Sequence, residues 1–396
     1  MGALEGLRVL DMTQYEAGPG CTQALAWLGA DIVKVESRDG DPARGPAGHG
    51  YGFLLWNGNK RSLSIDLRNP EGRDLLLKMV PNYDVFVENF GPGSMERLGL
   101  DYEAMKTVNP EIIYARIKGY GLSGPWSGYK CFDMVAQAAA GAFSITGEAD
   151  GPPMRPGPTM GDSGTGVQMA LSITAAYVQK LKTGKGQMIE ISMQEAMTWY
   201  LRTAVGSGKY GTRPAQRSGN GKSPTSMLYK AKGDGPNDYI YIMGTTQPMW
   251  ENICKAMDRL DLLEDPRFAT IEDTKENMDA LVPEIAAWVA ARDKYAAMQA
   301  LCEVGVPASA VLDTTDLYNI PHLVERGFVH EVDHPELGTI KVLGWAPRLS
   351  ESEVTIKPAP VLGQHSREVI EEDLGLTEEA FNALLADGVV QEWSQT

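Results

Sequence analysis

Short apolar segments alternate with helical segments over the first 120 residues, and this alternation restricts the fold more than any other feature of the chain. The expected strands lie at 6–12, 30–36, 61–66, 83–88 and 111–117, with helices at 20–29 and 70–80. Consecutive strands that are joined by a crossover helix run parallel. We therefore predict an α/β fold whose large domain is an open, doubly wound sheet of the Rossmann type.

The length of 396 residues predicts more than one domain, because a domain averages roughly 150 residues. Gly, Ser, Lys, Arg and Pro dominate residues 206–236, which indicates a linker and a mobile loop. We expect four segments: the N-terminal part of the large domain (1–205), a linker with a Gly-rich loop (206–224), a small α/β domain (225–325), and a return to the large domain (326–396).

Charge and composition exclude several classes of protein. The chain has 52 acidic and 36 basic residues, a net charge of −16, which argues against binding to nucleic acid. Many basic residues nevertheless lie in the first hundred positions, so a small polyanion is not excluded. No apolar run is long enough to cross a bilayer. Four isolated cysteines and the absence of a signal-peptide pattern predict a cytoplasmic protein.

Several chemical motifs are absent or incomplete. His330 and His334 have the spacing of helical metal ligands, but Pro335 interrupts a helix there, so no metal and no permanently bound cofactor are expected. There is no Walker motif and no GxGxxG after the first strand. Residues 161–166 approach the nucleophile elbow GxSxG, but Thr165 stands where glycine is required, so a serine hydrolase is not supported.

Asp162 lies between a Pro/Gly-rich loop and a long apolar helix expected at 165–181. Aspartate commonly caps a helix N-terminus, and this structural role alone would explain the residue. An ionised carboxylate at a helix N-terminus is also a usable nucleophile toward a thioester carbonyl. The local sequence leaves both readings open.

The whole chain resembles the class III CoA-transferases, the family of formyl-CoA:oxalate, crotonobetainyl-CoA:carnitine and benzylsuccinate CoA-transferases. The matching motifs occur in family order at 4–11, 17–19, 28–36, 59–62, 87–93, 118–121, 160–166, 183–187 and 193–196. The resemblance implies that Asp162 is the catalytic nucleophile and that coenzyme A thioesters are the substrates. It implies covalent ping-pong catalysis through an aspartyl anhydride and an aspartyl-CoA thioester.

The resemblance also assigns binding residues in the large, CoA-binding domain. The implied contacts with coenzyme A are Gln14, Tyr15, Arg38, Leu67, Arg68, Asn89, Phe90, Arg97 and Lys130. Each of them is otherwise explained as ordinary surface or core, and Arg97 and Lys130 are the contacts we favour most. Gly219, Asn220 and Gly221 fall where the family carries a Gly-rich lid; a plain interdomain loop is the alternative.

Two positions depart from the family pattern. Glu16 stands where formyl-CoA transferase has a glutamine near the reacting carbonyl, so a second carboxylate is expected beside Asp162 and makes oxalate less favoured as acceptor. We include Glu16 among the catalytic candidates. Phe132 stands where the racemase relatives have a histidine base, which disfavours α-proton exchange.

Residues near the expected lid indicate which acceptor the chain uses. An insertion that formyl-CoA transferase has just before its lid is missing here, so we expect a different acceptor pocket. A larger or aromatic acid would suit Trp199, Tyr200, Tyr210 and Met227, and a second carboxylate could pair with Arg202, Arg213 and Arg217. A dicarboxylic or aromatic acceptor such as benzylsuccinate, with succinyl-CoA as donor, is expected on this basis. Solvated linker surface explains the arginines equally well.

Several alternatives to this reading remain open. They are a formyl-CoA:oxalate or carnitine-type reaction, an acyl-CoA racemase or epimerase, and a non-catalytic partner subunit. The resemblance further implies an interlocked dimer, either a homodimer or a heterodimer with a homologous subunit.

Overall fold

A parallel sheet forms the centre of the larger part of the molecule, as predicted. The computed structural model describes residues 1–394. Within them, seven strands are arranged in the order β13-β3-β2-β1-β4-β5-β6. Their bounds are β1 Arg8–Met12, β2 Asp31–Glu36, β3 Arg61–Ile65, β4 Val85–Glu88, β5 Ile113–Lys118, β6 Gln187–Ser192 and β13 Val390–Gln391. All neighbouring strands are parallel except β13, which pairs antiparallel with β3. The strand order reverses between β1 and β4, and ligands of doubly wound folds bind at such a switch point.

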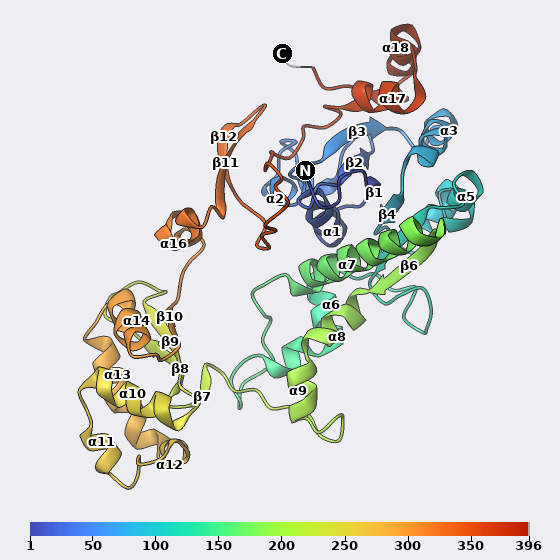
Figure 1. Cartoon of the computed structure of the whole chain (residues 1–396). Helices are drawn as coiled ribbons and strands as arrows, with labels where there is room; N and C mark the ends of the chain where they lie inside the picture. Colours follow the sequence, from blue (N-terminus) through green and yellow to red (C-terminus); the bar gives the residue numbers. More distant parts are fainter. Residues whose placement is uncertain (395–396) are drawn as a thin grey trace. The chain divides into compact units, whose positions relative to one another are not determined.

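Helices cover both faces of this sheet (Figure 1). One core includes side chains of α3 (Pro70–Met79), α5 (Tyr102–Val108), α17 (Ser366–Leu374) and α18 (Glu378–Ala386). The other includes side chains of α1 (Ala17–Ala26), α6 (Asp133–Ala140) and α7 (Met160–Thr183). The near-continuous apolar strands of the sheet follow from this double coverage, because neither face meets water.

Close packing of α1 against α7 depends on a glycine. A Cβ atom at Gly166 would lie 2.6 Å from the carbonyl oxygen of Ala17, so a larger residue would force the two helices apart. The remaining short elements of this part are η1 Pro42–Arg44, α2 Tyr51–Trp56, η2 Val80–Asn82, α4 Ser94–Leu98, η3 Ala142–Ile145, α8 Met193–Tyr200, α9 Arg202–Ser207, β11 Val329–His334 and β12 Gly338–Leu343.

The chain divides into two compact units. The first comprises residues 1–142, 155–207 and 326–396, and the second comprises 143–154 and 208–325. No feature of the sequence indicated that 143–154 group with the second unit. The segment is held there by Arg217, whose guanidinium donates to the carbonyl oxygens of Glu148 and Gly151 at 3.0 and 2.6 Å.

The second unit contains an antiparallel sheet in the order β10-β9-β8-β7. Its elements are β7 Gly221–Ser223, β8 Ser226–Lys230, β9 Tyr239–Met243, α10 Gln247–Met257, α11 Asp261–Glu264, α12 Ile271–Glu276, α13 Met278–Ala290, α14 Lys294–Glu303, β10 Ala308–Ala310, α15 Asp316–Asn319 and α16 Pro321–Glu325. The prediction that 206–236 form only linker and loop is therefore wrong. Ser223 and Thr225 close a turn through their hydroxyls, 3.0 Å apart, and β8 buries Tyr229.

None of the helices in residues 1–394 combines the length and the apolar character that crossing a bilayer requires. In the same residues, no three His, Cys, Asp or Glu side chains are grouped so that they would hold a metal ion.

Candidate active site

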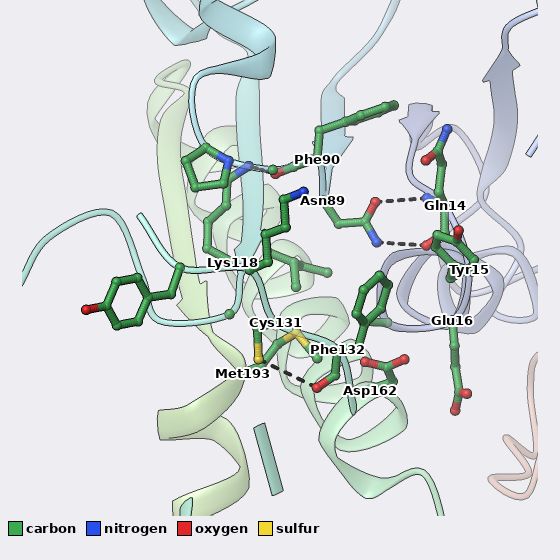
Figure 2. Close-up of a pocket in the computed structure, with 17 residues that line it drawn as sticks. Gln14, Tyr15, Glu16, Asn89, Phe90, Lys118, Cys131, Phe132, Asp162 and Met193 are labelled. Atoms are coloured by element: carbon green, nitrogen blue, oxygen red, sulfur yellow. Dashed lines mark hydrogen bonds between the residues drawn. The ribbon is translucent and has the colours of Figure 1, made fainter. Parts of the chain in front are cut away.

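A hydrogen-bonded pair connects the loops that follow β1 and β4 at the switch point. The side-chain oxygen of Asn89 accepts from the backbone N–H of Gln14 at 2.8 Å, and the Asn89 amide donates to the Gln14 carbonyl at 2.8 Å (Figure 2). A cavity of about 300 Å³, which we call the switch-point cavity, opens beside this pair. The pair thus fixes the spacing of the two loops beside the cavity.

The loop after β1 is held in an uncommon backbone conformation. Tyr15 has φ 64°, a left-handed value that costs a residue other than glycine roughly 1–3 kcal/mol. Two buried charged groups stabilise it: Lys34 donates to the Thr13 carbonyl at 2.7 Å, and Asp41 accepts from the Tyr15 N–H at 3.2 Å. As a result, the Tyr15 ring meets the Phe132 ring edge-on, with centroids 5.8 Å apart.

Asp162 is placed in the first turn of α7 by a contact between two helix N-termini. Its backbone N–H donates to the carboxylate of Asp133, the first residue of α6, at 3.0 Å. A Cβ atom at Gly161 would lie 2.8 Å from both the carbonyl and a carboxylate oxygen of Asp133. Only glycine at position 161 allows this approach.

Negative charge surrounds the Asp162 carboxyl. Burial, followed by the nearby carboxylates of Glu16 and Asp133, raises the pKa of Asp162 to about 7. Burial also raises the pKa of Glu16, although its Oε1 accepts hydrogen bonds from the hydroxyls of Thr159 and Ser163, both at 2.6 Å. Asp162 is therefore a carboxyl group that changes its charge near neutral pH, where a general acid, base or nucleophile is most useful.

The switch-point cavity also carries positive charge, contributed by Lys118 and Lys130. Lys118 ends β5, and its ammonium donates to Glu88 at 2.8 Å and to the Phe90 carbonyl at 2.5 Å. Burial lowers the pKa of Lys118, opposed by Glu88. We did not single out Lys118 from the sequence, although it lies in the matching motif at 118–121 and directly follows an apolar strand.

A second cavity, of about 240 Å³, lies at the carboxyl ends of β1, β2 and β3; we call it the strand-end cavity. Gln14 and Phe90 line both cavities. Of the sequence-predicted coenzyme A contacts, the structure brings seven to these two cavities: Gln14, Tyr15, Leu67, Arg68, Asn89, Phe90 and Lys130.

Arg38 and Arg97, which are both described, line neither of these two cavities. The Arg97 guanidinium donates to the Ser94 hydroxyl at 3.0 Å, and Arg38 approaches Gly388. Arg97 was one of the two contacts that we favoured most from the sequence.

A third cavity, of about 400 Å³, shares Tyr15, Glu16, Phe132 and Asp162 with the switch-point cavity; we call it the Trp56 cavity. Its other lining residues are Ala43, Gly52, Trp56, Asp133, Met134, Val135 and Thr159. Sequence reasoning missed Gly52 and Trp56, because no motif marks them. Asp162 therefore lies where two cavities meet.

The candidate lid and one of the acceptor arginines have contacts within their own units. Gly219, Asn220 and Gly221 belong to the second unit, where the Gly219 N–H donates to the Gly147 carbonyl at 2.9 Å. The Arg202 guanidinium lies 4.0 Å from the centre of the Trp199 ring. The role of the lid stays a prediction.

The fold and the site together define a doubly wound α/β protein with a titratable carboxylate at the switch point. Residues 4–366 match the family described as CoA-transferase family III. The chain belongs to this family and is a family III CoA-transferase, as the sequence motifs indicated.

Relatives and solved structures agree with this assignment. A formyl-CoA:oxalate CoA-transferase of Streptomyces coelicolor is 37% identical, with 98% of this chain and 99% of the relative covered. One of Rhodopseudomonas palustris is 36% identical, with 95% and 94% covered. A CAIB/BAIF family protein from Brucella suis has a TM-score of 0.85 at 28% identity, covering 94% of this chain and all of that chain.

Proposed function

We propose that the protein moves coenzyme A from an acyl-CoA donor to a carboxylic acid acceptor, with Asp162 as the nucleophile. One observation carries the proposal: a partly buried carboxyl group with a pKa near 7 lies where the switch-point cavity and the Trp56 cavity meet. A thioester with coenzyme A on one side and an acyl group on the other would place its carbonyl at this point. Coenzyme A thioesters are then substrates, and no permanently bound cofactor is required.

Each step exchanges one bond at a carbonyl carbon. The Asp162 carboxylate attacks the donor thioester, a C–O bond forms, and coenzyme A leaves as a thiolate, which yields an aspartyl anhydride. The thiolate attacks the Asp162 carbonyl and releases the donor acid, leaving an aspartyl-CoA thioester. The acceptor carboxylate then attacks this thioester, and the thiolate returns to the acceptor carbonyl and frees Asp162. No step needs an external oxidant, reductant or proton.

Two basic side chains and the Asn89–Gln14 pair have binding roles in this proposal. Lys130 and Arg68 supply charge for the phosphates of coenzyme A, while the Asn89–Gln14 pair keeps the entrance open. Water has to be excluded because it would hydrolyse the anhydride. Gly219, Asn220 and Gly221 serve this purpose as a lid.

Trapping the covalent intermediate tests the mechanism. The protein is incubated with acyl-CoA, treated with borohydride or hydroxylamine, and digested, and the mass of the peptide that carries Asp162 is measured. We expect a modified Asp162 in the wild type and none in Asp162→Asn. An unmodified Asp162 during turnover, or full transfer activity of Asp162→Ala, would exclude the proposal. Solvent deuterium at the α-carbon of the acyl group would indicate the racemase alternative.

A dimer is the quaternary structure that we propose. An apolar stripe on α7 remains exposed in the single chain: Val167, Leu171, Val178 and Leu181. Their spacing of 4, 7 and 3 residues places them along one face of the helix, and a second, homologous chain would bury them. Light scattering on the purified protein should give twice the chain mass, and Leu171→Glu should shift it toward the monomer. We further propose a cytoplasmic location.

A further inference from the structure

The Trp56 cavity lacks a positive charge. Among the described residues that line it there is no lysine, arginine or histidine, whereas Glu16, Asp133 and Asp162 contribute carboxyl groups. An acceptor that carries a second carboxylate away from the reacting one would have to place this charge beside Glu16 or Asp133, unpaired. Like charges in a partly desolvated site disfavour such a ligand.

The remaining lining of this cavity is apolar and aromatic. Trp56 at the end of α2, Phe132 before α6, and Met134 and Val135 on α6 supply most of it. A volume of about 400 Å³ is in the range of pockets for ring-sized ligands and would leave a two-carbon acid loosely held. An acceptor with a large apolar group therefore fits the Trp56 cavity best.

Two of the three arginines that suggested a dicarboxylic acceptor have contacts within their own units. Arg217 donates to the backbone carbonyls of Glu148 and Gly151 within the second unit, and Arg202 stacks on Trp199. Arg202, which belongs to the same unit as the Trp56 cavity, does not line it.

We infer that the acceptor is a monocarboxylic acid with a bulky apolar or aromatic body, which occupies the Trp56 cavity while its carboxylate meets Asp162. This inference rests on the proposed CoA transfer and narrows its substrate class. It separates this chain from the formyl-CoA:oxalate CoA-transferases among its relatives, because oxalate is a small dianion.

Gly52 lines this cavity and has no side chain that would limit the size of the acceptor body. It lies in the first turn of α2 with no backbone strain, and a Cβ atom added there would meet no heavy atom within 4 Å. A larger side chain at position 52 would therefore be accommodated without disturbing the fold, and we expect it to narrow the cavity that Gly52 lines.

Transfer rates with four acids test the inference. The donor is the acyl-CoA that labels Asp162 fastest, and the acceptors are 3-phenylpropanoate, benzylsuccinate, oxalate and acetate. We expect kcat/KM for 3-phenylpropanoate to exceed that of the other three by roughly tenfold or more. A dicarboxylate or acetate that is equally good would overturn the inference while CoA transfer itself stands. Absence of transfer to every acid, with Asp162 unlabelled, would contradict the proposed function and remove this inference with it.

Two substitutions locate the specificity in the cavity. Gly52→Phe should lower the ratio of kcat/KM for 3-phenylpropanoate to kcat/KM for acetate by roughly tenfold. Tyr51→Ala, at the neighbouring position where the side chain is 88% exposed, should leave this ratio unchanged. Val135→Arg adds a positive charge to the cavity and should raise kcat/KM for benzylsuccinate relative to kcat/KM for 3-phenylpropanoate. Val108→Arg on α5 is the control and should leave this ratio unchanged. Unchanged ratios in folded Gly52→Phe and Val135→Arg would overturn the assignment.

Discussion

The two cavities that meet at Asp162 differ in their charge. Both cavities share the carboxyl groups of Glu16 and Asp162. The switch-point cavity adds the ammonium groups of Lys118 and Lys130, whereas the Trp56 cavity adds apolar side chains and the Asp133 carboxylate. The same sheet edge thus offers one environment that suits a polyanion and another that suits an apolar body. Asp162 lies between them, and its pKa is raised to about 7 first by burial and then by the carboxylates of Glu16 and Asp133.

Removal of the shared carboxylate should have the largest effect. Asp162→Asn keeps the backbone hydrogen bond to Asp133 but loses the nucleophile, so kcat should fall by roughly 10⁴-fold. A steady-state assay measures this, with the exposed Asp234→Asn as the control. Residual activity above a tenth of the wild-type rate would contradict the role of Asp162.

The same substitution should stabilise the protein, because a partly buried carboxylate beside two other carboxylates opposes folding. Folding raises the pKa of Asp162 from 3.8 to about 7, so the cost is absent below the lower value and complete above the higher one. Asp162→Asn should therefore raise the free energy of unfolding by as much as about 4 kcal/mol at pH 8 and by clearly less at pH 5. Denaturant unfolding at the two pH values measures the difference; an equal gain at both would contradict this origin.

Loss of charge on the basic side should weaken binding more than chemistry. Lys130→Ala should raise KM for the acyl-CoA by roughly tenfold with little change in kcat, because a charge-assisted contact with phosphate is lost. Lys182→Ala, near the C-terminal end of α7, provides a matched control. An unchanged KM would remove Lys130 from the binding site.

The smallest expected effect is a shift of the pH–rate profile when the Glu16 carboxylate is removed. Glu16 raises the pKa of Asp162, so Glu16→Gln should lower it and move the acidic limb of the pH–rate profile below the wild-type position near pH 7. Activity at pH 6 relative to pH 8 should increase several-fold, since a larger fraction of Asp162 is ionised. A limb that stays in place would show that Glu16 does not set this pKa.

The alternation of strands and helices was enough to predict the parallel sheet, because crossover connections leave few topologies open. Asp162 was singled out by its position after a Pro/Gly-rich loop and by the family motif. The left-handed Tyr15, the contact of Asp133 with Asp162 and the place of Lys118 depend on which loops meet at the switch point, and no local pattern encodes this. Gly52 and Trp56 were missed for the same reason. Strands β7 and β8 were missed because Gly, Ser and Pro in a hairpin resemble a linker.

Gly161 and Asp162 are neighbours in the sequence, but different requirements keep each residue in place. Gly161 is required by the approach of two helix N-termini, with 2.8 Å between its missing Cβ and Asp133, and this requirement is independent of catalysis. A descendant of this fold that abandoned CoA transfer would be free to replace Asp162 but would still need glycine beside it. Glycine without aspartate at this place would thus mark a chain that kept the architecture after losing the reaction.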